Sequence, residues 1–311
     1  MKLVILIPAY NEEKNIEKTV SDIPRGITGV DEVKILVVND GSTDQTKNLA
    51  DKSGADKIIS HKRNLGVGAA FMTGIRNAIS MNADIVVTVD GDSQANVNDI
   101  PGLIEPILNN QFDVVIGTRF LKNIPEGYPK IKLIGNRIFT NLVSLVAGQK
   151  FTDSQTGLRA YSKEAITNIS VVNDFTYTQE VLLDLKFKGY RIGDIPITVN
   201  YYRKDSKVAK NIFKYTFKSL LIILRSMIYH RPMLSFGLFG LLLIGGGVLA
   251  KLLTTYVEGF YITAGLSTGL IILGVVSFMI GGFASVVFKR QSFTEKEIRH
   301  FLKEFKKYDT N

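Results

Sequence analysis

Short apolar runs alternate with amphipathic segments over roughly the first 200 residues of the chain. Five runs rich in valine, isoleucine and leucine have the length of buried strands, at 3–7, 33–38, 57–59, 85–89 and 114–116. Helical spacing of apolar residues lies between the first four runs, at 12–21, 44–52 and 66–81. Strands that alternate with helices are typical of βαβ units, so the pattern predicts an α/β fold with a mostly parallel sheet covered on both faces.

Two much longer apolar stretches follow. Pro232–Ala250 has 19 residues without a charge, and Gly259–Phe288 has 30. As a helix, each can cross the roughly 30 Å of a bilayer's hydrocarbon core. We therefore expect two transmembrane helices, and the alternative is a pair of buried core helices.

The charges around these stretches predict their orientation. Basic residues lie outside them and the short connection is poor in charge, so the positive-inside rule places both ends of this region in the cytoplasm. The residues concerned are Arg225, His230 and Arg231 before the first stretch, Lys251 and Glu258 in the connection, and Lys289 and Arg290 after the second. The N-terminal apolar run stops at Pro8, so no cleavable signal peptide is expected.

Three further segments have an amphipathic pattern. At 131–146, isoleucine and leucine repeat at helical spacing, and the segment fits either a core-facing helix or a helix in the membrane interface. At 211–229, a basic side accompanies an apolar face beside the first long stretch, which favours an interface helix. Thr294 and Glu297 form a capping box that predicts a separate C-terminal helix.

These patterns predict four parts of the chain. They are a cytosolic domain at 1–210, an amphipathic interface helix at 211–231, two transmembrane helices at 232–290 and a cytosolic C-terminal helix at 291–311. We therefore expect a multi-pass protein of the cell membrane with its main domain in the cytoplasm.

The amino-acid composition excludes several kinds of catalytic and binding site. The chain of 311 residues has no cysteine, which excludes disulfides, thiolate metal sites and thiol nucleophiles. Its net charge of +9 is concentrated at 201–231, next to the long apolar stretches. This position favours an anionic membrane surface over nucleic acid as the partner of the basic residues.

The stretch Val86–Asn96 is the strongest chemical signal. Asp90, Asp92 and Gln94 alternate directly after a strand, so their oxygens can converge on one hard cation. Mg²⁺ or Mn²⁺ held in this way usually takes its other ligands from water and substrate phosphates. A solvated acidic turn is the alternative, and only the surrounding motifs favour a metal-bound diphosphate.

Other polar groups fit an anionic ligand. Six turn-forming residues, 39–44, follow the second strand, and Asp40 among them can accept hydrogen bonds from a base or a ribose. Arg119 ends the fifth strand, while Arg203 and Lys207 precede the basic helix, and such groups bind phosphate. The glycines at 66–68 do not form a dinucleotide fingerprint, because Phe71 stands where its third glycine would be.

Six motifs in order resemble those of family-2 glycosyltransferases, and within them the polyprenyl-phosphate glycosyltransferases of the dolichyl-phosphate mannose synthase group. They are PAYNEE at 8–13, VVNDGSTD at 37–44, NLGVGAA at 64–70, VDGDSQ at 89–94, GTRF at 117–120 and DSQTGLRAY at 153–161. The resemblance implies a GT-A fold over about residues 1–210. Processive polysaccharide synthases of the family carry a Gln-x-x-Arg-Trp motif, and this chain has no tryptophan, which favours transfer of a single sugar.

The resemblance also implies roles for individual residues. The nucleotide sugar would contact the residues Pro8, Ala9, Tyr10, Glu12, Asp40, Asp90, Gly91, Asp92, Arg119, Arg203 and Lys207. The metal would be bound by Asp90, Asp92 and Gln94, and the acceptor phosphate by Arg119 and Arg137. Catalytic roles would fall to Asp92, to Arg203 on the departing diphosphate, and to Asp153, which would position substrate or act as a base.

The expected reaction is inverting, metal-dependent transfer of one hexose to dolichyl or polyprenyl phosphate at the cytoplasmic face of the membrane. The donor would be GDP-mannose or UDP-glucose, which the residues do not distinguish. A glycosyltransferase for another lipid acceptor, such as a glycolipid or diacylglycerol, is one alternative. A non-catalytic anchor that binds nucleotide sugar is the other.

Overall fold

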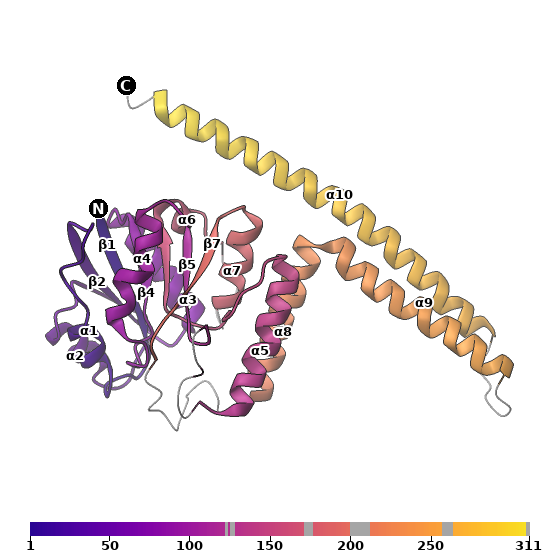
Figure 1. Cartoon of the computed structure of the whole chain (residues 1–311), viewed down its shortest axis with the longest axis horizontal. Coiled ribbons are helices and arrows are strands. Elements are labelled where there is room, and N and C mark those ends of the chain that lie inside the picture. The colour runs from indigo at the N-terminus through magenta and orange to yellow at the C-terminus, as the bar shows by residue number, and fades with distance from the viewer. Residues whose placement is uncertain (122–123, 125–127, 171–176, 200–211, 257–263, 309–311) are drawn as a thin grey trace. The chain divides into compact units, whose positions relative to one another are not determined.

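The computed structural model describes residues 1–121, 124, 128–170, 177–199, 212–256 and 264–308 (Figure 1). Arg203 and Lys207, two predicted donor-binding residues, lie outside the described residues. The chain forms two compact units, an N-terminal unit at Met1–Ile223 and a C-terminal unit at Leu224–Asn311.

The N-terminal unit is an α/β domain built on one seven-stranded sheet with the order β3-β2-β1-β4-β6-β5-β7. The strands are β1 Lys2–Ala9, β2 Glu32–Asn39, β3 Lys57–Ser60, β4 Ile85–Thr88, β5 Val114–Thr118, β6 Arg159–Ser162 and β7 Ile192–Pro196. The helices are α1 Ile16–Ser21, α2 Thr46–Lys52, α3 Val67–Ser80, the short 3₁₀ turn η1 Val97–Asp99, α4 Ile100–Leu108, α5 Lys130–Ala147, α6 Lys163–Thr167 and α7 Thr178–Phe187. Helix α8, Ile212–His230, begins in this unit, and its residues from Leu224 onward belong to the C-terminal unit.

The five predicted strands and the helices between the first four are confirmed, and so is a mostly parallel sheet. One strand differs, because β6 pairs antiparallel with both β4 and β5. Periodicity did not indicate this strand, whose Arg159–Ala160–Tyr161–Ser162 sequence is short and has a buried arginine at its start. The antiparallel strand brings the 153–158 loop to the end of β4.

Both faces of the sheet are covered. Alternate residues of β1, namely Leu3, Ile5 and Ile7, join a core with residues of α1 and α4. On the other face α3 lies close to β1, because a Cβ atom added to Gly74 would lie 2.1 Å from the side chain of Leu6. The strands therefore read as almost continuous apolar runs, as expected of a sheet buried on both sides.

Helix α5 has a buried face and an exposed apolar face. The exposed face carries Ile131, Ile134, Ile138 and Leu145, and the first of these is 74% exposed. The buried face includes two polar residues, Asn136 and Thr140. The isoleucine face, which fitted either the core or the membrane interface, is therefore exposed, while hydroxyl and amide groups pack inward.

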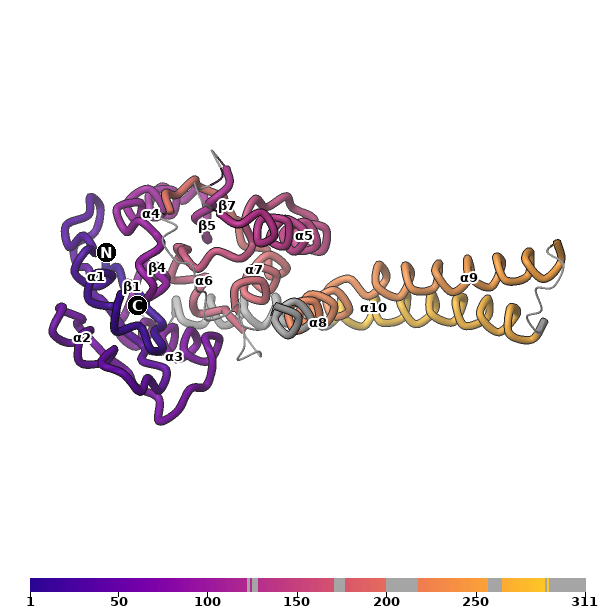
Figure 2. Tube along the Cα trace, turned by 90° about the horizontal axis from the view of Figure 1, so that it is seen from below, coloured from indigo at the N-terminus to yellow at the C-terminus, as the bar shows by residue number. Residues whose placement is uncertain are grey.

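The C-terminal unit contains two long helices, α9 Pro232–Tyr256 and α10 Ala264–Tyr308, which lie side by side (Figure 2). They pack closely at a glycine pair, since a Cβ atom on Gly240 or on Gly274 would lie 2.6 Å from the other's carbonyl oxygen. The Ser277 hydroxyl donates to the Phe236 carbonyl at 2.7 Å.

Both helices are long and apolar enough to cross a bilayer, over Pro232–Tyr256 and Gly265–Phe288. Large apolar side chains such as Leu242 and Phe283 are about three-quarters exposed in the chain, at 74% and 75%. Core helices of a water-soluble protein would bury these side chains, so the exposure suggests membrane association.

The predicted separate C-terminal helix is not present. Helix α10 continues without a break from Ala264 to Tyr308, so Thr294 lies inside a helix instead of capping one. The local capping signal was overridden because the helix already had a long apolar segment from which to propagate.

Candidate active site

The loops after β1, β2 and β4 meet at one edge of the sheet, because these strands are parallel neighbours. The Asp40 amide donates to the Ala9 carbonyl at 2.9 Å. A Cβ atom on Gly91 would lie 3.3 Å from the Pro8 carbonyl oxygen, so the Asp-Gly-Asp loop contacts the loop that contains Tyr10, whose side chain is exposed. The structure thus brings together three of the motifs that the sequence separates by tens of residues.

Side chains fasten the first two loops to each other. Asn11 adopts a left-handed conformation with φ of 52°. Its amide donates to Ser42 Oγ at 3.0 Å, and its side-chain oxygen accepts from the Thr43 amide at 2.9 Å. The Glu12 amide donates to Thr46 Oγ1 at 2.7 Å. These bonds hold the predicted nucleotide-binding loop in one shape before any ligand arrives.

Asp40 is buried and already engaged by the protein. Its Oδ1 accepts from the Leu65 amide at 2.9 Å and lies 2.7 Å from His61 Nδ1, while Oδ2 accepts from the Gly66 amide at 2.8 Å. The other ring nitrogen of His61 lies 3.0 Å from Thr73 Oγ1. In this structure Asp40 holds the 61–66 loop, and its contact with a base or ribose stays a prediction.

Asp90 occupies a position that only glycine at residue 157 allows. A Cβ atom on Gly157 would lie 2.3 Å from both carboxylate oxygens of Asp90. The Thr88 hydroxyl donates to the Gly157 carbonyl at 2.6 Å and fixes the loop at this point. The Asp90 side chain is open to solvent, so its carboxylate can reach a ligand.

Enclosure by the surrounding protein and repulsion from Asp92 raise the pKa of Asp90 to about 7, while Arg119 and Arg159 oppose the rise. Because the side chain is also open to water, hydration limits this rise. The loop therefore holds the Asp90 and Asp92 carboxylates near each other, and a bound cation would relieve their mutual repulsion.

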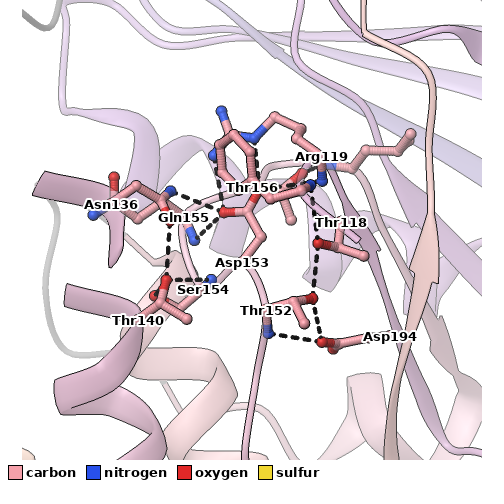
Figure 3. A network of polar contacts seen from close by, with 12 residues as sticks. Thr118, Arg119, Asn136, Thr140, Thr152, Asp153, Ser154, Gln155, Thr156 and Asp194 are labelled. Carbon is pink, nitrogen blue, oxygen red and sulfur yellow. Dashed lines mark hydrogen bonds and ion pairs between the residues drawn. The ribbon is translucent and has the colours of Figure 1, made fainter. Parts of the chain in front are cut away.

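Asp153 is fully buried and holds Arg119 by two hydrogen bonds (Figure 3). Arg119 Nε donates to Oδ2 at 2.6 Å and Nη2 donates to Oδ1 at 2.9 Å. Asn136 Nδ2 and the Gln155 amide also donate to Oδ1, at 3.0 and 3.2 Å. Burial alone would raise the pKa of Asp153, but the Arg119 charge and these bonds outweigh it and hold the pKa below its usual value.

A catalytic base needs a pKa near the working pH and a free lone pair directed at the substrate. Asp153 has a lowered pKa and accepts from five donors on its two oxygens, so its geometry favours the positioning role over the role of a base. Arg119 is the group it positions. The Arg119 side chain is 20% exposed, and its guanidinium carbon lies 5.2 Å from the centre of the Phe120 ring and 5.9 Å from that of the Tyr128 ring.

A second set of bonds supports the same loop (Figure 3). The Thr152 amide and hydroxyl donate to Asp194 Oδ2 of β7 at 2.8 and 2.6 Å. Thr140 of α5 accepts from the Ser154 amide at 3.1 Å. The 152–156 loop is therefore fastened to α5 and β7, which makes Arg119 part of a rigid assembly.

Helix α5 presents Asn136, and not Arg137, to this network. Asn136 is 2% exposed and bonded to Asp153, whereas Arg137 lies on the exposed side with Ile134 and Ile138. Lys132 precedes Asn136 by four residues and so lies on the same stripe of the helix. Arg137 is exposed on the other side of α5, and its role at the acceptor phosphate stays a prediction.

The side chains of the Asp90–Gln94 loop can supply some, but not all, of the ligands of a divalent cation. Two carboxylates and one amide oxygen are the ligand types that Mg²⁺ and Mn²⁺ prefer. No group of three or more His, Cys, Asp or Glu residues able to hold a metal occurs among the described residues. A cation here would therefore need water and substrate oxygens, which is the usual arrangement for a metal that binds with a diphosphate.

The model of the family described as "Glycosyl transferase family 2" matches residues 4–170, which include all of these loops. The chain belongs to this family. It is a glycosyltransferase with a GT-A-like domain, as the resemblance implied.

Relatives of this glycosyltransferase act on lipid phosphates, as their names state. A UDP-N-acetylglucosamine–dolichyl-phosphate N-acetylglucosaminyltransferase of Methanococcus voltae is 33% identical over 71% of this chain and 95% of its own length. A dolichyl-phosphate hexose transferase of Haloferax volcanii is 31% identical over 66% of this chain and 86% of its own length.

A solved structure supports the fold. Glucosyl-3-phosphoglycerate synthase of Mycobacterium tuberculosis, in a complex with Mn²⁺, UDP-glucose and phosphoglyceric acid, has a TM-score of 0.59 and 23% identity. The match covers 72% of this chain and 79% of that one. At this level of identity the likeness concerns the fold of the domain.

Sequence reasoning missed several residues that shape the site. Gly157 lies in the DSQTGLRAY motif, but its role depends on its distance from Asp90 in the folded chain. The spacing of residues in the sequence does not give that distance. Asn136 was hidden because the isoleucines of α5 dominated its pattern. Thr88 gave no signal, since a threonine in a strand is ordinary.

Replacing Gly157 by alanine should move the Asp90 carboxylate without unfolding the protein. The backbone at this position does not need glycine, and the group in the way is the end of an exposed side chain that can rotate. We expect the melting temperature to stay near that of the wild type and Mn²⁺ affinity to fall at least about tenfold. Gly102→Ala is the matched control, because nothing lies within 4 Å of the added atom. Equal Mn²⁺ affinity in both variants would contradict the assigned role of Gly157.

Proposed function

We propose that this glycosyltransferase transfers one sugar, a hexose such as mannose or glucose, from a nucleotide sugar to dolichyl or polyprenyl phosphate at the cytoplasmic face of the membrane. The observation that carries the proposal is the Arg119 guanidinium, a positive charge that buried Asp153 holds within electrostatic reach of Asp90. The relatives that are named for dolichyl phosphate support the choice of acceptor.

The arrangement of Asp153 and Arg119 is suited to this reaction. A polyprenyl phosphate is anionic at neutral pH and needs no base to become a nucleophile. This matches an Asp153 whose oxygens are already bonded. Arg119 would orient the anionic groups, and attack opposite the departing nucleoside diphosphate would invert the anomeric centre.

Asp90, Asp92 and Gln94 would hold Mg²⁺ or Mn²⁺ in this proposal. The bound cation would supply positive charge to the nucleoside diphosphate as it leaves, a contribution of several kcal/mol in related chemistry. Arg203 and Lys207, which lie outside the described residues, remain predicted to assist at the same diphosphate.

The apolar surfaces support a site at the membrane. The exposed isoleucines of α5 and the exposed Leu220, Leu221 and Leu224 of α8 are suited to the boundary between headgroups and acyl chains. Helices α9 and α10 would anchor the protein as two spans. With both termini in the cytoplasm, the site would face the phosphate of a lipid in the inner leaflet.

A panel of donors and acceptors tests the reaction. Purified full-length protein in detergent would be incubated with labelled GDP-mannose, UDP-glucose or UDP-N-acetylglucosamine and with polyprenyl phosphate, free polyprenol or diacylglycerol. We expect a labelled lipid only with polyprenyl phosphate, and a loss of at least about tenfold in Asp92→Asn.

Each other outcome of this panel is informative. Product with diacylglycerol or free polyprenol and none with polyprenyl phosphate would overturn the proposed acceptor. Undiminished product from Asp92→Asn would overturn the metal site. Binding of nucleotide sugar without transfer to any acceptor would favour an anchor.

The two cations of α5 provide a matched test of the acceptor site. Lys132→Met should raise the KM for polyprenyl phosphate about tenfold, since one charged hydrogen bond contributes about 1.5–3 kcal/mol. Arg137→Met, on the exposed side of the same helix, should change it less than about threefold in detergent. A reversal of the two effects would favour Arg137 over Lys132 as the acceptor residue.

The binding of Mn²⁺ should become tighter as the pH rises from about 6 to about 8. The raised pKa of Asp90 means that a proton competes with the cation at the lower pH, and deprotonation removes this competition. Electron paramagnetic resonance of free Mn²⁺ at the two pH values measures the change. Affinity that stays constant or falls with pH would contradict the assignment of Asp90 as a ligand.

A further inference from the structure

Two hydroxyl groups connect α1 to the Asp90–Gln94 loop. Thr19 Oγ1 lies 2.6 Å from Ser93 Oγ and 3.4 Å from the Gly91 carbonyl oxygen. Ser93 Oγ in turn lies 2.9 Å from the Asn15 carbonyl oxygen. Thr19 Oγ1 lies 3.1 Å from the same Asn15 carbonyl oxygen. Each hydroxyl has one proton, so one of the two donates the 2.6 Å bond while the other donates to the Asn15 carbonyl.

Thr19 is a buried residue of α1, and Ser93 belongs to the Asp90–Gln94 loop. Thr19 is 2% exposed and belongs to the buried side of α1. The helix follows directly on the predicted nucleotide-binding loop, and Asn15 Nδ2 donates to Glu12 Oε2 at 2.9 Å. The hydroxyl pair therefore joins the buried side of α1 to the Asp90–Gln94 loop.

The backbone at Ser93 shows why this connection matters. Ser93 has φ of 56°, in the left-handed region that residues other than glycine, asparagine and aspartate seldom adopt. Such a conformation persists when surrounding contacts enforce it. Ser93 stands between Asp92 and Gln94, and the Gln94 amide donates to Asp92 Oδ1 at 3.2 Å. A change at Ser93 would thus redirect both neighbours.

We propose that Thr19 and Ser93 are positioning residues which hold the Asp90–Gln94 loop in its cation-binding shape through their paired hydroxyl groups. Neither touches the cation. They fix the backbone from which the Asp92 and Gln94 side chains project. The loop therefore loses little conformational freedom when the cation binds. The proposal rests on the proposed function, because it assigns these residues to its metal site.

Mn²⁺ alone is the probe for the test. Full-length protein in detergent would be titrated with Mn²⁺ into the millimolar range, with free and bound ion measured by electron paramagnetic resonance and water proton relaxation. Both the number of sites and the dissociation constant come from the same titration. Partial unfolding lowers the number of sites, whereas a misplaced loop raises the dissociation constant at an unchanged number.

Thr19→Val removes the hydroxyl and keeps the shape of the side chain. We expect its Mn²⁺ dissociation constant to rise about tenfold, in line with the loss of groups that orient metal ligands. Thr19→Ser, which restores a hydroxyl, should recover most of the affinity. Ser21→Ala is the control on the same helix, because among the described residues the Ser21 hydroxyl bonds only within α1, to the carbonyls of Glu17 and Lys18.

Ser93→Asn gives an independent measurement, because asparagine tolerates the left-handed backbone while it removes the hydroxyl. Its dissociation constant should rise by a similar factor. Affinities within about twofold of the wild type for both Thr19→Val and Ser93→Asn would overturn the proposal. If the wild type itself fails to bind Mn²⁺, or if Asp92→Asn binds it equally well, the proposed metal site fails instead.

Discussion

The buried ion pair between Arg119 and Asp153 is the constraint on which the site depends. A carboxylate with no exposed surface is strongly destabilising unless charge and hydrogen bonds compensate it, and removal of one partner from such a pair costs about 3–5 kcal/mol. Arg119 supplies the charge and two of the bonds. Because Arg119 follows β5 and Asp153 follows α5, the pair fixes two distant segments against each other and makes the position of the guanidinium a property of the fold.

The same constraint limits the chemistry that the site can perform. Asp153 uses its lone pairs to hold Arg119 and Asn136, so it has little capacity to accept a proton from a neutral hydroxyl. An acceptor that carries its own negative charge avoids this need. The proposed lipid phosphate acceptor and the occupied carboxylate are therefore consistent with each other, whereas a sugar or glycerol hydroxyl would require a base from another part of the chain.

The order of the strands and helices in the first part of the domain could be predicted from sequence because each element carries its own period. The antiparallel strand β6 could not, because its four residues have no distinctive pattern and its place depends on pairing with β4 and β5. The same division holds at the site. Asp90 and Asp92 are recognisable by their spacing after a strand, while Gly157 matters only through a distance of 2.3 Å that exists once the chain is folded.

Arg137 shows why the face of a helix has to be seen and cannot be assumed. The sequence of α5 has apolar residues on two faces, and its isoleucine face fitted either the core or the membrane interface. In the structure, the loop with Asp153 is polar and takes Asn136 and Thr140, so the isoleucines are left outside. With those isoleucines in the membrane interface, as proposed, a helix about 10 Å across separates the lipid boundary from Asp153. The helix would then both anchor the domain and set the depth at which Arg119 meets a phosphate, which gives its outward apolar face a part in catalysis as well as in attachment.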